Sequence, residues 1–333
     1  MVINNFSSLA KNINSLVKLF YMSTDVVYVV GHKSPDTDSV CSSIAYAYLK
    51  QKKFGMNTIP ARQGELNPET KFVLEKFNVD IPDLLTDGTD KKVILVDHNE
   101  KAQSLDNIEK AEILEIIDHH KIGDVTTPNP IFFLAMPVGS SATIITLLYE
   151  HYGVEIPKSI AGILLSSILS DTVVFKSPTT TDLDKEVSGR LAKIAGIDDV
   201  EKFGVELKTI KAKADVEQKS PKELLTSDLK DYVMAGKKVA VGQVELIELS
   251  VIEPVKPKLL EEMKNLKKKE GYHSIFLMLT DIMKEGTELL TVTEDPDIIK
   301  KAFNKELTGN SVWLEGVMSR KKQVVPPLEK SFG

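Results

Sequence analysis

Short apolar runs alternate with helical patterns along the first 200 or so residues of the chain. Three of these runs are apolar and rich in β-branched residues, as the buried strands of a parallel sheet are: Val26–Val30, Val93–Val96 and Ile113–Ile117. Small and apolar residues then recur at helical spacing over Ser39–Lys52, directly after the first run. The pattern predicts an α/β fold with a parallel, doubly wound sheet that begins with a strand, a loop and a helix.

Three more helices are predicted before the pattern changes. Helical spacing covers Ser140–Glu150, Ser159–Ser170 and Thr181–Ala195. Between Lys208 and Lys222 the hydrophobic pattern lapses into lysine, alanine, glutamate and proline, which is typical of an exposed connection. We therefore expect a first domain over residues 22–211 and a linker over residues 212–219.

The remaining residues, 220–333, predict a smaller α/β domain. A helix is expected over Pro257–Lys269, and its charge run from Lys264 to Glu270 is typical of a solvated helix face. The expected strands are Val239–Val244, Ser274–Leu279 and Glu288–Val292.

The composition of the chain limits the number of domains and the classes of partner that are expected. A chain of 333 residues has room for about two domains. Its 42 basic and 48 acidic residues give a net charge of −6, and no segment dominated by lysine and arginine is present, so nucleic acid is not the expected partner.

Location can also be predicted from the sequence. A single cysteine, Cys41, and the lack of an apolar run of about 20 residues predict a reduced, cytoplasmic, non-membrane protein. Residues 1–21 carry no secretory h-region and are expected to be a dispensable extension.

Acidic and imidazole side chains concentrate in four segments that follow predicted strands or helices. They are the loop from Gly31 to Asp38, the pair Asp97-His98, the run Asp118-His119-His120, and Asp171. In open parallel sheets the loops at the carboxyl ends of strands meet at one crevice. Imidazole nitrogens and carboxylate oxygens suit Mn²⁺, Co²⁺ or Zn²⁺, whereas a single cysteine excludes a Cys₄ zinc site. The sequence therefore predicts a histidine–carboxylate metal centre.

The spacing of Asp36 and Asp38 favours a centre with two metals, because alternate carboxylates of a loop can reach two neighbouring cations. Two such cations can share a hydroxide and clamp the oxygens of a phosphoryl group, which is chemistry for hydrolysis of phosphoanhydrides or phosphoesters. Taken alone, Asp36 and Asp38 are also what a helix N-cap requires, and a lone His98, His151 or His273 is more often structural. The coincidence of four segments favours the metal centre.

Five short motifs, taken in their order along the chain, resemble those of the DHH phosphoesterase superfamily. The resemblance is to the family II, manganese-dependent inorganic pyrophosphatases in particular. The cationic run Ser319-Arg320-Lys321-Lys322-Gln323 is the last of these motifs, and it suits an anionic substrate. The other four are Gly31–Ser39, Val96–Glu100, Asp118–Lys121 and Ser170–Thr172.

The resemblance implies a division of the site residues. One metal would be held by His32, Asp36 and Asp97, and the other by Asp38, Asp97, His119 and Asp171, with Asp97 bridging. His120, Arg320 and Lys321 would act on the substrate, together with a lysine of the C-terminal domain that we match to Lys230. Asp97, His120, Arg320 and Lys321 would be the catalytic residues.

The activity that the resemblance implies is hydrolysis of pyrophosphate to two phosphates. A hydroxide between two Mn²⁺ ions would attack in a cleft between the two domains, with Mg²⁺ accompanying the substrate. Co²⁺ could replace Mn²⁺. The family also implies a homodimer formed through the N-terminal domain.

Relatives in the superfamily supply the alternatives. Nucleic-acid hydrolases carry a glycine-rich C-terminal motif that is missing here, and exopolyphosphatases tend to have asparagine where this chain has His32. Regulated pyrophosphatases insert nucleotide-binding domains before the third motif, but His98 and Asp118 are only 20 positions apart. A short-chain exopolyphosphatase or another DHH phosphoesterase remains the alternative enzyme, and a silent metal- or phosphate-binding regulator is the alternative of another class.

Overall fold

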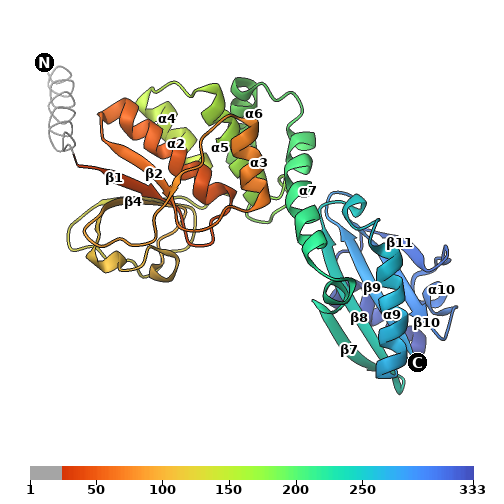
Figure 1. Ribbon diagram of the computed structural model, residues 1–333. Coiled ribbons are helices and arrows are strands. Elements are labelled where there is room, and N and C mark those ends of the chain that lie inside the picture. The colour runs from red at the N-terminus through yellow and green to blue at the C-terminus, as the bar shows by residue number, and fades with distance from the viewer. Residues whose placement is uncertain (1–24) are drawn as a thin grey trace, which may run out of the picture. The chain divides into compact units, whose positions relative to one another are not determined.

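The computed structural model describes residues 25–333, so the expected extension at residues 1–21 lies outside the described part (Figure 1). The chain divides into two compact units, the first ending at Leu207 and the second beginning at Lys208. Among the described residues, no helix is long and apolar enough to span a bilayer.

The first unit is built on a six-stranded sheet in which all neighbouring strands are parallel, in the order β3-β2-β1-β4-β5-β6. The direction of this order reverses between β1 and β4, and ligands bind at such a switch point in doubly wound sheets. The expected fold class is confirmed. The strands are β1 (Val27–Val30), β2 (Thr58–Arg62), β3 (Asp83–Leu84), β4 (Lys92–Val96), β5 (Glu112–Asp118) and β6 (Phe132–Ala135).

Helix α2 (Thr37–Phe54) follows β1 and runs through the core. The side chain of Asp36 caps it by accepting a hydrogen bond from the Ser39 amide at 2.9 Å, and Gly55, at φ 68°, ends it in the left-handed conformation. Figure 1 shows α2, α4 and α5 gathered side by side in this unit. The other helices of the unit are α3 (Pro68–Lys76), α4 (Ser141–Tyr152), α5 (Lys158–Asp171) and α6 (Asp182–Ala195), with short 3₁₀ turns at Lys101–Gln103 and Ile108–Lys110.

A buried polar cluster joins the middle of α2 to β5. The Nζ atom of Lys50 lies 2.6 Å from Oε1 of Glu115, and the Tyr46 hydroxyl donates to Oε2 of the same carboxylate at 2.6 Å. All three residues are buried, so the carboxylate and ammonium compensate each other in the core.

The second unit contains a five-stranded sheet in the order β11-β10-β9-β8-β7, in which only β8 and β9 run parallel. Helix α9 (Lys256–Glu270) contacts β9 and β10, and a cluster that includes Phe276, Leu289 and Leu328 forms the core. This agrees with the smaller α/β domain that the sequence predicts. The strands are β7 (Leu229–Met234), β8 (Lys237–Leu246), β9 (Ser274–Asp281), β10 (Gly286–Thr293) and β11 (Ser311–Glu315), and the shorter helices are α8 (Pro221–Thr226), α10 (Ile298–Phe303) and α11 (Val325–Phe332), with a 3₁₀ turn at Leu249–Val251.

The polar stretch that we expected to be a linker is helical. Helix α7 (Val200–Gln218) runs through residues 212–218, and the division between the compact units falls earlier, after Leu207. The physical reason lies in helix propensity, because alanine, lysine, glutamate and glutamine all favour a helix even where they form no apolar face.

Candidate metal centre

Six acidic and imidazole side chains meet beyond the carboxyl ends of β1 and β4, where the strand order of the sheet reverses. The donor atoms of these six residues form two groups, which we call the main donor groups, and the atoms within each group lie within 4.8 Å of one another. The residues come from the loop after β1, the start of α2, the residue after β4, the residue after β5 and the last residue of α5. The first group is His32, Asp36 and Asp97, and the second is Asp38, Asp97, His119 and Asp171. A third such group consists of Asp97, His119 and His120.

In the first group His32 faces two carboxylates. Its Nε2 atom lies 3.4 Å from Oδ2 of Asp36 and 3.4 Å from Oδ2 of Asp97. Its other nitrogen, Nδ1, lies 2.7 Å from the carbonyl oxygen of Lys33. A proton on Nδ1 donated to that carbonyl leaves the Nε2 lone pair free to bind a cation, the usual arrangement for a metal-binding histidine.

The second group repeats this arrangement around His119. Its Nε2 atom lies 3.3 Å from Oδ1 of Asp97 and 3.8 Å from Oδ2 of Asp171, while Nδ1 lies 3.0 Å from the carbonyl oxygen of Val138. Asp38 is fully buried and accepts the amide of Ser141, at the start of α4, at 2.7 Å. The positive end of that helix therefore supports the carboxylate.

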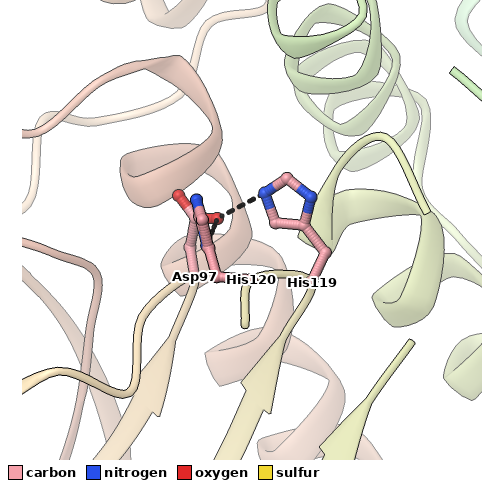
Figure 2. A group of neighbouring side chains, drawn as sticks. All are labelled: Asp97, His119 and His120. Atoms are coloured by element: carbon pink, nitrogen blue, oxygen red, sulfur yellow. Dashed lines mark ion pairs between the residues drawn. The ribbon is translucent and has the colours of Figure 1, made fainter. Parts of the chain in front are cut away.

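Asp97 belongs to both groups, and its two oxygens face different histidines: Oδ2 faces His32 and Oδ1 faces His119. Figure 2 shows the His119 ring directing a nitrogen at the Asp97 carboxylate. The residue is 1% exposed and has a left-handed backbone with φ of 62°. Aspartate tolerates this conformation better than most residues, and here it turns the chain sharply after β4. One carboxylate is thus placed to join two cations.

The protonation of the histidines shows how strongly the site favours positive charge. Burial alone would lower the pKa of His32, but hydrogen bonds to Asp36 and Asp97 raise it to about 11. For His119 burial also lowers the pKa, and the hydrogen bond to Asp97 outweighs it, so that the pKa is raised to about 9. Without a metal, both rings are protonated on both nitrogens, and so positively charged, at pH 7.

Burial and the crowding of negative charge also raise the pKa of two of the carboxylates. Burial, followed by the charge of Asp97, raises the pKa of Asp38 to about 7, and burial raises the pKa of Asp171 well above its usual value. Burial would raise the pKa of Asp97 too, but its hydrogen bonds to His119 and His32 lower it. A pair of divalent cations requires crowded carboxylates and imidazole nitrogens that can give up their protons, so the residues fit Mn²⁺.

His120 differs from the other histidines because its side chain is 52% exposed. Its Nδ1 atom lies 2.9 Å from Oδ1 of Asp118, which also accepts the backbone amide of His120 at 3.1 Å. The hydrogen bond to Asp118 raises the pKa of His120. Asn99 in turn donates to the other Asp118 oxygen, so His120 is held over the hollow that it lines with His32 and Asp97.

Asp118 and Asn99 lie in the motifs Asp118–Lys121 and Val96–Glu100, but the sequence predicts no individual role for either residue. Only the structure shows that they orient His120, because nothing in the sequence indicates which side chains meet across 19 residues. His98 is 3% exposed, and its Nδ1 lies 2.9 Å from the carbonyl oxygen of Val96. Burial lowers the pKa of His98 to about 4, so its ring is neutral and it belongs to neither donor group.

The other three predicted substrate residues lie in the second unit. Arg320 begins a π-helical turn (Arg320–Val324), and its Nη1 atom donates to the carbonyl oxygen of Asp228 at 2.6 Å and lies 2.9 Å from Oδ2 of that residue. The Nζ atom of Lys230 is 3.9 Å from Oδ1 of Asp228. Lys321 is exposed. The structure thus brings Arg320 and Lys230 together.

Comparisons with known proteins agree with this geometry. Residues 26–168 match the model of the DHH family N-terminal domain, and residues 208–331 match that of the DHHA2 domain. A protein of Archaeoglobus fulgidus named "Probable manganese-dependent inorganic pyrophosphatase" is 61% identical over 318 residues, which cover 92% of this chain and 98% of that protein. The chain belongs to the family II, manganese-dependent inorganic pyrophosphatases. The resemblance seen in the sequence motifs is confirmed.

Other pyrophosphatases of the family are similarly close. The manganese-dependent inorganic pyrophosphatase of Methanothrix thermoacetophila is 51% identical over 310 residues, 92% of this chain and 99% of that protein. A crystal structure of a candidate family II inorganic pyrophosphatase from Methanococcus jannaschii is 49% identical, with a TM-score of 0.57 and coverage of 92% of this chain and 99% of that one.

Metal binding to this pyrophosphatase is expected to release protons. At pH 7 a metal-free centre holds protons on His32 and His119, whose pKa values are about 11 and 9, and the nitrogens must lose them to bind a cation. We expect at least two protons to leave per protein, and Mn²⁺ affinity to fall as the pH is lowered from 8 to 6. Calorimetric titration in PIPES and in Tris at one pH measures this release. Equal heats in the two buffers would contradict the assignment of these histidines.

Proposed function

We propose that this chain hydrolyses inorganic pyrophosphate to two phosphates at a centre of two Mn²⁺ ions. The observation that carries the proposal is the pair of donor groups that share Asp97. Each group offers imidazole nitrogen and carboxylate oxygen, and the shared carboxylate directs one oxygen at each group. Membership of the pyrophosphatase family supports the substrate.

Two bound cations would supply a nucleophile of lowered pKa and would neutralise charge on the phosphoryl oxygens. The residues of the chain prepare the site for both tasks. His32 and His119 present Nε2 because backbone carbonyls hold their Nδ1 atoms. The Nδ1 atom of His120 bonds to Asp118, and the exposed side of the ring lines the hollow. Because the pKa of His120 is raised, the protonated ring is favoured, and its positive charge can interact with a phosphate oxygen.

The second unit would supply further positive charge to the phosphate oxygens of the substrate. Arg320 presents a planar fork of donors that matches two phosphate oxygens, and Lys230 and Lys321 add point charges. The common contact of Arg320 and Lys230 with Asp228 supports our choice of Lys230. We propose that these three side chains bind phosphoryl oxygens of the substrate during catalysis.

A homodimer and a cytoplasmic location are further parts of the proposal, as are Co²⁺ as a substitute and Mg²⁺ with the substrate. The exposed edge strand β6 supports the dimer, because Phe132 and Phe133 are 41% and 42% exposed there. An edge strand with unpaired backbone groups and apolar side chains is suited to pairing with a second copy.

The experiment that tests the function measures phosphate released from pyrophosphate, tripolyphosphate, ATP and a dinucleotide. The protein is first treated with a chelator, and Mn²⁺, Co²⁺, Zn²⁺ or Mg²⁺ is then restored. We expect fast release from pyrophosphate alone, strongest with Mn²⁺ or Co²⁺. Preferred cleavage of tripolyphosphate or of the dinucleotide would favour an exopolyphosphatase or another phosphoesterase. Release of no phosphate from any of the four compounds would favour a binding protein.

A further inference from the structure

We propose that Glu69 is a positioning residue that sets the spacing of the metal ligands on two different helices. Glu69 is the second residue of α3 and is 1% exposed. A glutamate near a helix N-terminus is favourable, but that does not explain why this one is buried. A buried carboxylate is costly unless hydrogen bonds satisfy it, so its partners indicate its role.

Those partners are residues next to metal ligands. The hydroxyl of Thr37 donates to Oε1 of Glu69 at 2.8 Å, and the hydroxyl of Ser170 donates to the same oxygen. Thr37 stands between Asp36 and Asp38 at the start of α2, and Ser170 precedes Asp171 at the end of α5. One oxygen atom thus joins the two segments that carry three of the six ligands.

The three residues form a buried unit and are not part of a solvated surface. Thr37 is 0% exposed and Ser170 is 6% exposed. The Thr37 hydroxyl also lies 3.1 Å from that of Thr70, the neighbour of Glu69, so α3 holds the start of α2 through two side chains. The link crosses 32 residues to Thr37 and 101 to Ser170, and no local turn could supply it.

The link affects the metal centre because Asp38 and Asp171 belong to the same donor group. A cation needs its ligand oxygens at fixed distances of about 2.0–2.2 Å, and a misplacement of about half an ångström is enough to weaken a site. If α2 and α5 were free to shift against each other, Asp38 and Asp171 would no longer bind one ion together. Glu69 is expected to prevent that shift without touching the ion.

This inference rests on the proposed function only for the identity of the metal, and it is tested on the Mn²⁺ affinity of the metal-free protein. Glu69→Ala removes the shared acceptor and should weaken Mn²⁺ binding about 10- to 100-fold, the usual cost of losing an outer-shell partner. Glu69→Gln keeps a carbonyl oxygen that both hydroxyls can reach, so its affinity should stay within about threefold of that of the parent. Binding is measured by calorimetry and by the paramagnetic resonance of free Mn²⁺.

The comparison of these two variants separates position from charge. If Glu69→Gln loses as much affinity as Glu69→Ala, the negative charge of Glu69 is what matters, and the positioning role is wrong. Steady-state kinetics provide a second readout: a positioning defect should raise the Mn²⁺ concentration needed for half-maximal activity, while saturating Mn²⁺ restores most of kcat.

The two hydrogen bonds can also be removed one at a time. Thr37→Val and Ser170→Ala each delete one donor, and each should weaken Mn²⁺ binding by less than Glu69→Ala does, whereas Thr37→Ser keeps the hydroxyl and should retain the parent affinity. Thr37→Val added to Glu69→Ala should cost little more, because both act through one link. These variants carry the test if Glu69→Ala does not fold.

Tyr46→Phe is the matched control. It removes a hydroxyl that donates to a buried carboxylate, Glu115, in the same unit, but neither residue belongs to a donor group. It should lower the melting temperature and leave Mn²⁺ affinity unchanged. Equal Mn²⁺ affinities in the parent, Glu69→Ala and Tyr46→Phe proteins would overturn the role of Glu69 but not the proposed function. A parent protein that binds Mn²⁺ yet does not hydrolyse pyrophosphate would overturn the proposed substrate but not the role of Glu69.

Discussion

Replacing Asp97 by alanine is expected to lower pyrophosphate hydrolysis by about four orders of magnitude, the scale seen when a residue of a catalytic unit is removed. Asp97 is the one residue shared by both main donor groups, with one oxygen at 3.4 Å from His32 and the other at 3.3 Å from His119. Its loss therefore weakens both metal positions together. Bound Mn²⁺, measured by elemental analysis after gel filtration, should fall from two ions to one or none.

A second carboxylate variant makes this result specific. Asp106→Ala also removes one negative charge from the unit, but Asp106 is exposed and forms a surface pair with Lys33 at 2.7 Å. Surface pairs of this kind contribute little, so activity should stay within about twofold of the parent. An Asp97→Ala protein that binds two Mn²⁺ ions and retains near-normal hydrolysis would refute the assignment of this carboxylate as the bridge.

The parts of the fold that could be predicted are those in which burial leaves a mark on the sequence. Strands β1, β4 and β5 are largely buried, and their apolar runs predicted each strand end to within one residue. By contrast, β2 contains Pro60, and β3 is two exposed residues long, so neither gives a continuous apolar pattern. Such strands are held by their neighbours in the sheet and have little intrinsic preference for it.

The residues of the candidate site also divide into those that the sequence could predict and those that it could not. Motifs at the ends of strands and of one helix made the six donor residues predictable, because chemistry at such ends uses recognisable residue types at fixed positions. Glu69 lies in none of these motifs, and Asn99 lies in the motif after β4 but has no role that the motif predicts. A lone charged or amide residue is expected at the surface, and only contacts across 101 and 19 residues make these two part of the site.

Replacing Arg320 by alanine is expected to lower kcat/KM for pyrophosphate about 10²- to 10³-fold, the cost of removing a charged donor from a developing negative charge, or roughly 2.7–4 kcal/mol. Bound Mn²⁺ should not change, because every residue of the donor groups lies in the first compact unit and Arg320 lies in the second. Arg320→Lys keeps the charge but not the planar fork, so its kcat/KM should be intermediate.

Lys330→Ala supplies the control for this prediction, since it removes a cation from α11 of the same unit, outside the cationic run. The side chain of Lys330 is exposed and takes part in no ion pair with a described residue. Activity should therefore remain within about twofold of the parent. If Arg320→Ala kept the parent KM and kcat, or if it lost Mn²⁺ as well as activity, Arg320 would not be a substrate ligand acting from the second unit. Loss of substrate affinity at constant metal content would support that role, and with it the need for both units in one catalytic cycle.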